Sequence, residues 1–340
     1  MLENLNILIF LLFRGESLGV FQAKQKGVIS KMKLSKFSIC MAAVSALLFS
    51  SCSNLASSDS ESSVSSDRSA TSVATSVTVT TESALRSAVN SASAGTTINL
   101  GANISLTSQL QLLNSGTSSS KINFNGCGYT LDCSGISSGW GVKVNGSYWN
   151  ICNMTITKAP GCGIVFQLGG NNYVYYVKTT YNGNTGLQIY NSAHDNYIYK
   201  CESYYNYDSS NGGEDADGFA CKLSAGKNNV FEGCVAAYNS DDGWDLYGQL
   251  YPVTIKDCIA KYNGYLNSSL ETSSDGDGNG FKLGSSGISV VHVCSGDSAY
   301  GNLASGFDGN GNTAAIKVSN CSSYNNKKYQ WYRITGISNQ

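Results

Sequence analysis

Apolar and polar residues alternate in short runs along much of the chain, as in Asn172-Tyr173-Val174 and Asn196-Tyr197-Ile198. Successive side chains of a β-strand point to opposite faces, so this alternation predicts short strands with one buried face. Each run is too short to bury that face by itself. We therefore expect the strands to stack on equivalent strands of a repeating structure.

A Tyr-Asn dipeptide marks the repeat. It occurs at Tyr181-Asn182, Tyr205-Asn206, Tyr238-Asn239, Tyr262-Asn263 and Tyr324-Asn325, with a variant at Tyr300-Gly301-Asn302. Successive asparagines are separated by 24, 33, 24, 39 and 23 residues. These spacings indicate a unit of about 24 residues with two insertions, one after Asn206 and one after Asn263.

Two further markers recur in phase with the first. A cysteine lies five residues before the asparagine at Cys201, Cys234 and Cys258. A glycine followed by a large apolar residue occurs at Gly163-Ile164, Gly186-Leu187, Gly218-Phe219, Gly243-Trp244, Gly280-Phe281 and Gly306-Phe307. Stacked coils would turn these markers into an aromatic stack, an asparagine ladder and a cysteine column. The sequence thus predicts an all-β protein, a parallel β-helix.

The N-terminal end of such a stack needs a lid. Residues Ser83 to Ala92 fit one, because their apolar side chains share a helical face; Thr80 or Thr81 can cap the start, and Gly95 can end the helix. We place the strand-rich β-helix domain at residues 79–333 and a Ser-rich linker at residues 53–78.

The segment before the linker has the plan of an export signal. Lys31, Lys33 and Lys36 precede the apolar run 37–49, and Cys52 follows it. We assign residues 32–52 to a signal peptide and residues 1–31 to an extension upstream of the true start at Met32. A lipobox reading makes Cys52 a lipid anchor of a bacterial cell-surface or outer-membrane lipoprotein; the alternative is ordinary cleavage and secretion.

Composition narrows the classes of function. The chain has 37 Gly, 21 Tyr and only 2 Pro, which suits many short strands and tight turns. Its formal net charge of -1 offers no general basic face for nucleic acid. Of the 12 cysteines, Cys40 and Cys52 belong to the signal, and we expect the other ten to be mostly free thiols, with Cys127 and Cys133 the favoured local disulfide.

Four aspartates converge in the repeat. Alignment of the glycine markers puts Asp217 and Asp242 in one slot of consecutive coils, with Asp241 and Asp245 close by. Carboxylates crowded at strand spacing repel one another, and the usual remedy is a hard cation held by oxygen ligands. We therefore predict that Asp217, Asp241, Asp242 and Asp245 bind Ca²⁺.

Lys282 shares its slot with Asp245 and Asp308. Beside a bound cation its pKa should be lowered, which would let Lys282 act as a catalytic base. The two histidines, His194 and His292, leave little material for a histidine triad or a zinc cluster.

These segments resemble the signature segments of the pectate lyases of polysaccharide lyase family nine. The resemblance rests on Asp217-Gly218-Phe219, the run 239–248 and Gly278-Asn279-Gly280-Phe281-Lys282, and covers roughly residues 80–330. It implies a right-handed β-helix, a catalytic calcium on the matching aspartates and Lys282 as the Brønsted base. The implied activity is calcium-dependent cleavage of polygalacturonate, the homogalacturonan of pectin, by β-elimination to unsaturated oligogalacturonides, by a protein that we expect to be a monomer. The chain stops soon after the coil of Asn325, which leaves fewer C-terminal coils for outer subsites.

Other interpretations remain open at this point. A polygalacturonase-type hydrolase and a non-catalytic carbohydrate-binding or adhesin β-helix also suit the fold. The run Asp275 to Gly280 imitates the start of an EF-hand loop, but Ser286 stands where that loop needs Glu. Asp277 or Asp308 could assist the metal site, and Tyr247, Tyr251 and Trp331 could stack on sugars, although packing is the commoner role of such residues.

Overall fold

The strands of the chain form two parallel sheets in a computed structural model that describes residues 75–334. The larger, 17-stranded sheet contains β1 (Ser76–Val79), β2 (Thr97–Leu100), β3 (Ile104–Ser105), β5 (Ile122–Asn125), β6 (Thr130–Asp132), β8 (Trp149–Thr157), β10 (Tyr173–Thr180), β12 (Tyr197–Tyr199), β13 (Glu202–Tyr204), β15 (Val230–Glu232), β16 (Val235–Ala237), β18 (Thr254–Lys256), β19 (Ile259–Lys261), β21 (Val293–Ser295), β22 (Ser298–Tyr300), β24 (Lys317–Ser319) and β25 (Ser322–Tyr324). The smaller, 9-stranded sheet contains β4 (Leu110–Leu112), β7 (Val142–Val144), β9 (Ile164–Phe166), β11 (Leu187–Ile189), β14 (Phe219–Cys221), β17 (Trp244–Asp245), β20 (Phe281–Lys282), β23 (Ser305–Asp308) and β26 (Tyr329–Tyr332).

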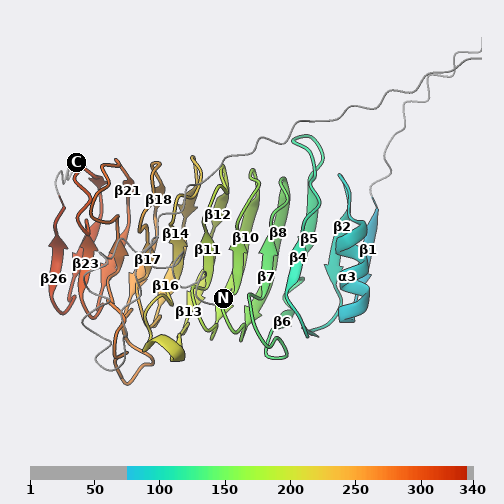
Figure 1. Cartoon of the computed structure of the whole chain (residues 1–340), viewed down its shortest axis with the longest axis horizontal. Coiled ribbons are helices and arrows are strands. Elements are labelled where there is room, and N and C mark those ends of the chain that lie inside the picture. Colours follow the sequence, from blue (N-terminus) through green and yellow to red (C-terminus); the bar gives the residue numbers. More distant parts are fainter. Residues whose placement is uncertain (1–74, 335–340) are drawn as a thin grey trace, which may run out of the picture. The chain divides into compact units, whose positions relative to one another are not determined.

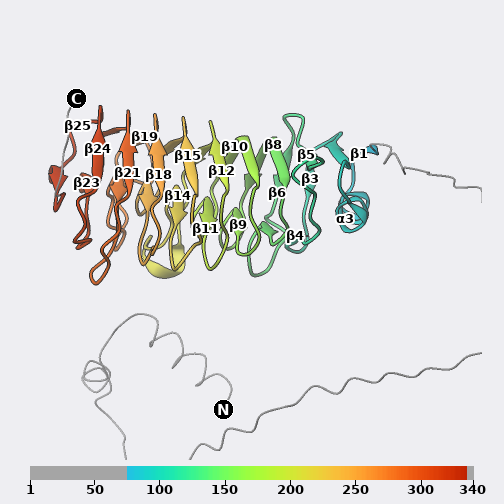
Figure 2. The same ribbon diagram turned by 90° about the horizontal axis from the view of Figure 1, so that it is seen from above.

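Each strand pairs in parallel with the equivalent strand of the next coil, as β14 does with β17 and β17 with β20. The result is the predicted right-handed parallel β-helix. Figure 1 shows the coils stacked in sequence order from β1 to β26. Seen from above in Figure 2, β8, β10, β12 and β15 of the larger sheet lie on one side and β9, β11 and β14 of the smaller sheet on the other.

The coils belong to one unit of the chain, Arg68–Gln340. The predicted upstream extension, the signal segment with Cys52, and the linker up to residue 74 lie outside the described residues. Strand β1 begins at Ser76, so the last three residues of the predicted linker are part of the larger sheet. Within residues 75–334 no helix is both long and apolar enough to cross a membrane.

An aromatic stack runs through the interior, as the glycine markers predict. The rings of Phe219, Trp244, Phe281, Phe307 and Trp331 follow one another from strand to strand of the smaller sheet. Neighbouring centroids are 4.5–4.8 Å apart, and the ring planes are within 24° of parallel. Trp331 thus packs at the end of the stack, where it is partly buried.

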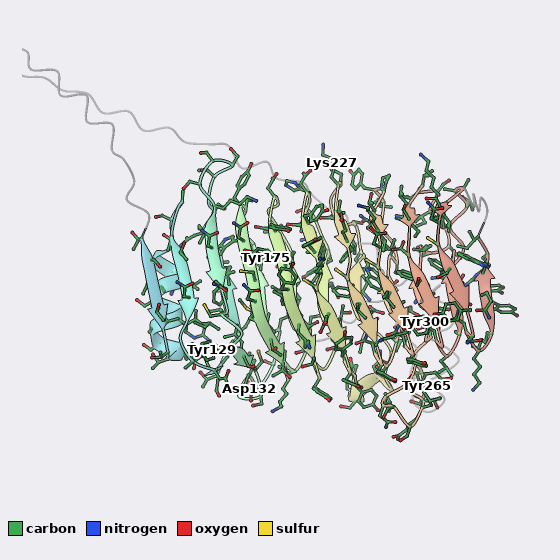
Figure 3. All side chains as sticks on the ribbon, turned by 180° about the vertical axis from the view of Figure 1, so that it is seen from behind. Tyr129, Asp132, Tyr175, Lys227, Tyr265 and Tyr300 are labelled. Carbon is green, nitrogen blue, oxygen red and sulfur yellow. The ribbon has the colours of Figure 1, made fainter. Side chains whose placement is uncertain are left out.

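The asparagine ladder is also present, with one correction. Its members are Asn182, Asn206, Asn239, Asn263, Asn302 and Asn326, and each side-chain Nδ2 donates to the Oδ1 of the next at 2.8–3.0 Å. The last member is Asn326 and not Asn325, because Tyr300 pairs in register with Tyr324 and both coils then carry one residue between the tyrosine and the ladder asparagine. Figure 3 labels Tyr300 and Tyr175 on the larger sheet.

Helix α3 (Glu82–Ser91) covers the N-terminal end of the stack through the buried Leu85 and Val89 (Figure 1). The hydroxyl of Thr81 caps it by accepting a hydrogen bond from the N–H of Ala84 at 3.2 Å. The predicted lid is confirmed. The helix ends at an extended Ala92 rather than at Gly95, whose N–H instead donates to the carbonyl of Lys121.

The ten cysteines of the described residues are all free thiols, and eight of them are buried. The proposed Cys127–Cys133 disulfide is wrong: Cys133 faces the core with no exposed surface, whereas Cys127 is exposed beside Asn99. The predicted column of Cys201, Cys234 and Cys258 continues through a different residue. The larger-sheet register puts Asp297 in the next slot and Cys321 in the one after it.

Candidate active site

Three consecutive strands of the smaller sheet, β14, β17 and β20, place the residues that the sequence singles out. Asp245 pairs in register with Lys282, and Lys282 with Asp308 of β23, so the predicted shared slot is confirmed. Asp217 precedes β14, and Asp241 and Asp242 precede β17. The strand pairing therefore brings together residues of different coils that are 24 to 65 positions apart in the sequence.

One carboxylate oxygen from each of Asp217, Asp241 and Asp242 lies within 4.8 Å of the other two. All three side chains are almost fully buried. Burial, and after it the neighbouring carboxylates, raises the pKa of Asp217 and of Asp242 well above the usual range, although Lys222 and Lys282 act in the opposite direction. Burial also raises the pKa of Asp241, to about 6. Ionising the three together is unfavourable unless a positive charge joins them.

The carboxylate oxygens of this group suit a hard cation. Backbone N–H groups of Asp215 and Asp277 donate to Asp241 at 3.0 and 2.7 Å, and that of Asn279 donates to Asp242 at 2.7 Å. The second oxygen of Asp242 is buried and accepts no hydrogen bond, although the ammonium of Lys282 lies 3.2 Å away. A rigid set of carboxylate oxygens with one such atom left over fits Ca²⁺, which binds oxygen ligands in irregular arrangements.

Asp245 lies apart from this group because Lys222 stands beside it. The ammonium of Lys222 is 2.9 Å from both Asp217 and Asp245. Burial opposes the charge of Asp245, but Lys222 and Lys282 together outweigh it and lower its pKa. Asp245 thus shares the ammonium of Lys222 with Asp217 and is the predicted ligand whose pKa these lysines hold below its ordinary value.

Lys222 is the residue that the sequence reasoning missed. It follows β14 directly and lies outside the slots defined by the glycine markers. The one available signal was its place five residues after Asp217, at the end of the same strand. Burial lowers the pKa of Lys222, but Asp217, Asp245 and Asp215 raise it well above its ordinary value, so Lys222 stays charged.

Lys282 lies between the carboxylate group and solvent. Its Nζ is 3.2 Å from Asp242 and 2.8 Å from Asp277, and its side chain is 13% exposed. Burial lowers the pKa of Lys282, but the four surrounding aspartates raise it well above its ordinary value. The sequence predicted a lowered pKa; the chain's own charges do the opposite, and only a further positive charge among the aspartates would reverse their effect.

The two insertions meet beside the site. The first contains η1 (Ser209–Asn211), and the second follows Asn263. Backbone N–H groups of Ser274 and Asp275 donate to the carbonyl of Gly212, which joins one insertion to the other. In Figure 1 both extend beyond the coils, in yellow and orange. They supply Asp215 and Asp277, whose N–H groups donate to Asp241, so both insertions contribute contacts to the site.

The EF-hand-like run belongs to this second insertion. Asp277 directs its carboxylate to Lys282, and the segments that flank the run in the described part of the chain are strands, not helices. Asp308 is engaged elsewhere, since Arg333 pairs with it through Nε at 2.8 Å and Nη2 at 2.5 Å. Tyr247 and Tyr251 are 40% and 48% exposed and remain available at the surface.

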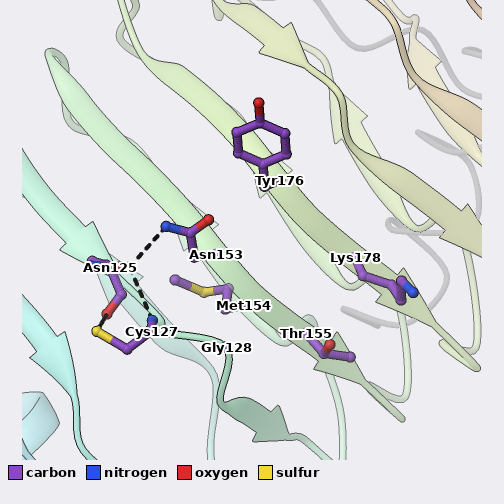
Figure 4. Close-up of a pocket in the computed structure, with 8 residues that line it drawn as sticks. All are labelled: Asn125, Cys127, Gly128, Asn153, Met154, Thr155, Tyr176 and Lys178. Atoms are coloured by element: carbon purple, nitrogen blue, oxygen red, sulfur yellow. Dashed lines mark hydrogen bonds between the residues drawn. The ribbon is translucent and has the colours of Figure 1, made fainter.

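A separate hollow of about 430 Å³ lies on the larger sheet (Figure 4). Its lining consists of Asn125, Cys127, Gly128, Asn153, Met154, Thr155, Tyr176 and Lys178. No carboxylate lines it, and its one charged group, Lys178, is paired with Glu202 at 2.7 Å. This hollow therefore offers fewer groups for acid–base catalysis or metal binding than the aspartate group of the smaller sheet does.

The fold and the site together define a parallel β-helix protein with an acidic, lysine-containing site on one sheet. The chain belongs to the Pel9A-like right-handed β-helix family, whose model matches residues 63–339. Among solved structures it is similar to the crystal structure of pectate lyase Pel9A, with a TM-score of 0.65 and 28% identity over 75% of this chain and 71% of that one. A rhamnogalacturonan lyase, at 22% identity and a TM-score of 0.58, shares the fold.

Curated relatives agree with this family. The chain is 39% identical over 200 residues to pectate lyase L of Paenibacillus polymyxa, covering 55% of this chain and 44% of that protein. It is 41% identical to pectate lyase L of Thermoclostridium stercorarium over 56% of this chain and 16% of that protein. Pectate lyase PEL9 of Emericella nidulans is 31% identical over 64% and 62% of the two chains. The chain thus spans less than half the length of the first two relatives.

Proposed function

We propose that this protein is a calcium-dependent pectate lyase that cleaves polygalacturonate by β-elimination and releases unsaturated oligogalacturonides. The observation that carries the proposal is the convergence of three buried aspartates within 4.8 Å, with Lys282 at 3.2 Å from one of them. The similarity to proteins named pectate lyase supports the substrate class.

The residues divide the chemistry among them. Asp217, Asp241 and Asp242 would hold the calcium ion. Asp245 would lie at the margin of this site, where Lys222 donates a hydrogen bond to it. Calcium, when bound, neutralises the carboxylate of the sugar and stabilises the charge that develops at C5. Lys282 in its neutral form, which a cation among the aspartates would favour, takes the C5 proton. The electrons of that C–H bond form the C4–C5 double bond, and the bond from C4 to the glycosidic oxygen breaks as that oxygen takes a proton from solvent.

Product analysis with and without metal tests the proposal. We expect the wild-type protein to form a product with ultraviolet absorbance from its double bond, to lose this activity after exhaustive chelation and to recover it with added calcium. A hydrolase would release saturated sugars, and a binding β-helix would release none. Full activity in a sample shown by elemental analysis to contain no metal would contradict the calcium requirement.

A further inference from the structure

The outward-facing column of the smaller sheet extends well beyond the aspartate group. Lys143 pairs in register with Val165, Val165 with Gln188, Gln188 with Ala220 and Ala220 with Asp245. Residues in register across parallel strands point to the same side of the sheet. Lys143 therefore faces the same side as Lys282, and the four strand-to-strand steps from Asp245 correspond to about 19 Å.

Lys143 is one of several half-buried side chains that are held together there. Its ammonium lies 5.7 Å from the ring centroid of Trp140. Trp140 and Tyr190 meet edge to face at 5.9 Å, and Gln167 donates to the hydroxyl of Tyr190 at 2.6 Å. An ammonium over one aromatic ring, with a second ring against the first, is an arrangement that suits acidic sugars, since aromatic rings stack on apolar sugar faces and the charge attracts a carboxylate.

The charge of Lys143 has no acidic counterpart. None of the ion pairs found between residues 75 and 334 includes Lys143, whereas Lys178 and Lys256 on the larger sheet are paired with Glu202 and Glu232. The column positions between Lys143 and Asp245 are the uncharged Val165, Gln188 and Ala220. A negatively charged chain lying along this column would meet no acidic side chain of the column before it reached the aspartates.

We propose that Lys143, Trp140 and Tyr190 form a distal subsite for a uronic acid residue of the polysaccharide that is cleaved at Lys282. This inference rests on the proposed function. The sugar carboxylate pairs with the ammonium of Lys143, and the sugar ring lies against the aromatic side chains. Because about 19 Å separates the subsite from Asp245, only a chain of several sugars contacts both places. The subsite would make the enzyme prefer long substrates.

Kinetics on substrates of two lengths test the subsite. We expect Lys143→Gln and Trp140→Ala each to raise the KM for polygalacturonate by about tenfold with little change in kcat, and to leave the kinetics on trigalacturonate unchanged. Lys200→Gln is the matched control, because Lys200 lies 5.2 Å from the ring of Tyr199 on the larger sheet and should affect neither substrate. Thermal unfolding of every variant checks that the fold is intact.

The outcomes separate the two proposals. Unchanged KM on the polymer, or an equal loss on polymer and trisaccharide, would overturn the subsite. If the wild-type protein forms no unsaturated product at all, the proposed function fails, and titration of polygalacturonate against wild-type protein and Lys143→Gln then decides the subsite by binding alone. Equal affinity of the two proteins in that titration would also overturn it.

Discussion

At the scale of single residues, two lysines lie in almost the same electrostatic environment and yet have different prospects. Lys222 bridges Asp217 and Asp245, both of them buried. Lys282 instead pairs with the buried Asp242 and with Asp277, whose side chain is 57% exposed. A cation bound by Asp217 and Asp242 would weaken one ion pair of each lysine. Lys222 would keep the buried Asp245, whereas Lys282 would keep Asp277, whose carboxylate is screened by solvent. This difference favours Lys282 over Lys222 as the base.

Replacement of Lys282 tests this assignment. We expect Lys282→Ala to lower kcat on polygalacturonate by about 100-fold to 10,000-fold at saturating calcium, since no other side chain takes over the proton transfer. Lys282→Arg should retain KM far better than kcat, because guanidinium keeps the charge but resists deprotonation. Initial rates of unsaturated product measure both. A folded, calcium-loaded Lys282→Ala protein that works at near wild-type rate would show that Lys282 only pairs with its aspartate neighbours.

The residues of the site were predictable to the extent that they follow the repeat. Asp245 and Lys282 share a slot because strand register is fixed by the same apolar alternation that marks the coils. The bridge made by Lys222 and the contact between Asp277 and Lys282 were not predictable, because they depend on the reach of long side chains and on insertions with no register. The raised pKa of Lys282 follows from those same contacts.

At the scale of an element, the column of cysteines in the larger sheet contains one acid. Asp297 takes the slot between Cys258 and Cys321 and accepts hydrogen bonds from the N–H groups of Cys258 at 2.8 Å and Ser295 at 3.0 Å. Burial raises its pKa to about 8, opposed by these hydrogen bonds, and Asp257 adds a further increase. The neutral, protonated carboxyl is therefore the form that suits the column.

This predicts a pH dependence of stability with a definite sign. The pKa of Asp297 is higher in the fold than its ordinary 3.8, so its contribution is fully present below about pH 4 and is lost as the pH rises through about 8. We expect Asp297→Asn, which imitates the protonated acid, to reduce the fall in unfolding free energy over this range, measured by urea denaturation. Glu271→Gln, at an exposed position of the second insertion, is the control and should leave the pH dependence as it is. A wild-type slope retained in Asp297→Asn would contradict the assignment.

Elements built by periodicity were predictable, and elements built by chain-specific contacts were not. The aromatic stack, the asparagine ladder and helix α3 follow from marker spacing and a helical apolar face. Two features became apparent only from the pairing of β22 with β19 and β25. They are the presence of Asp297 where the column would otherwise have a cysteine, and the place of Asn326 in the ladder. Short irregular spacings leave such one-residue choices open, because neighbouring polar residues suit them equally well.

At the scale of the whole molecule, we propose that the chain is exported and carries lipid on Cys52. The Lys-rich start, the apolar run 37–49 and Ser51-Cys52 support this proposal. We expect the mature protein to begin at Cys52 with an acylated N-terminus, as mass spectrometry of protein purified from its native membrane fraction would detect. A Cys52→Ala variant, which removes the acceptor, should be recovered from the soluble fraction. An unmodified N-terminus beyond Cys52 would exclude the anchor and leave secretion standing.

The asparagine ladder also separates what must stay constant in this molecule from what is free to change. Asn206 donates to Asn239 and Asn263 to Asn302 at the same distances as the other members, although these pairs are 33 and 39 positions apart in the sequence instead of about 24. The hydrogen bonds of the ladder are therefore the same whether or not an insertion lies between two of its asparagines. Residues 207–215 and 264–277 can therefore change in length or sequence during evolution, and the surroundings of Lys282 change with them. The side-chain amides of the ladder asparagines keep their partners throughout. Substrate preference can diverge in this way without any new fold having to arise.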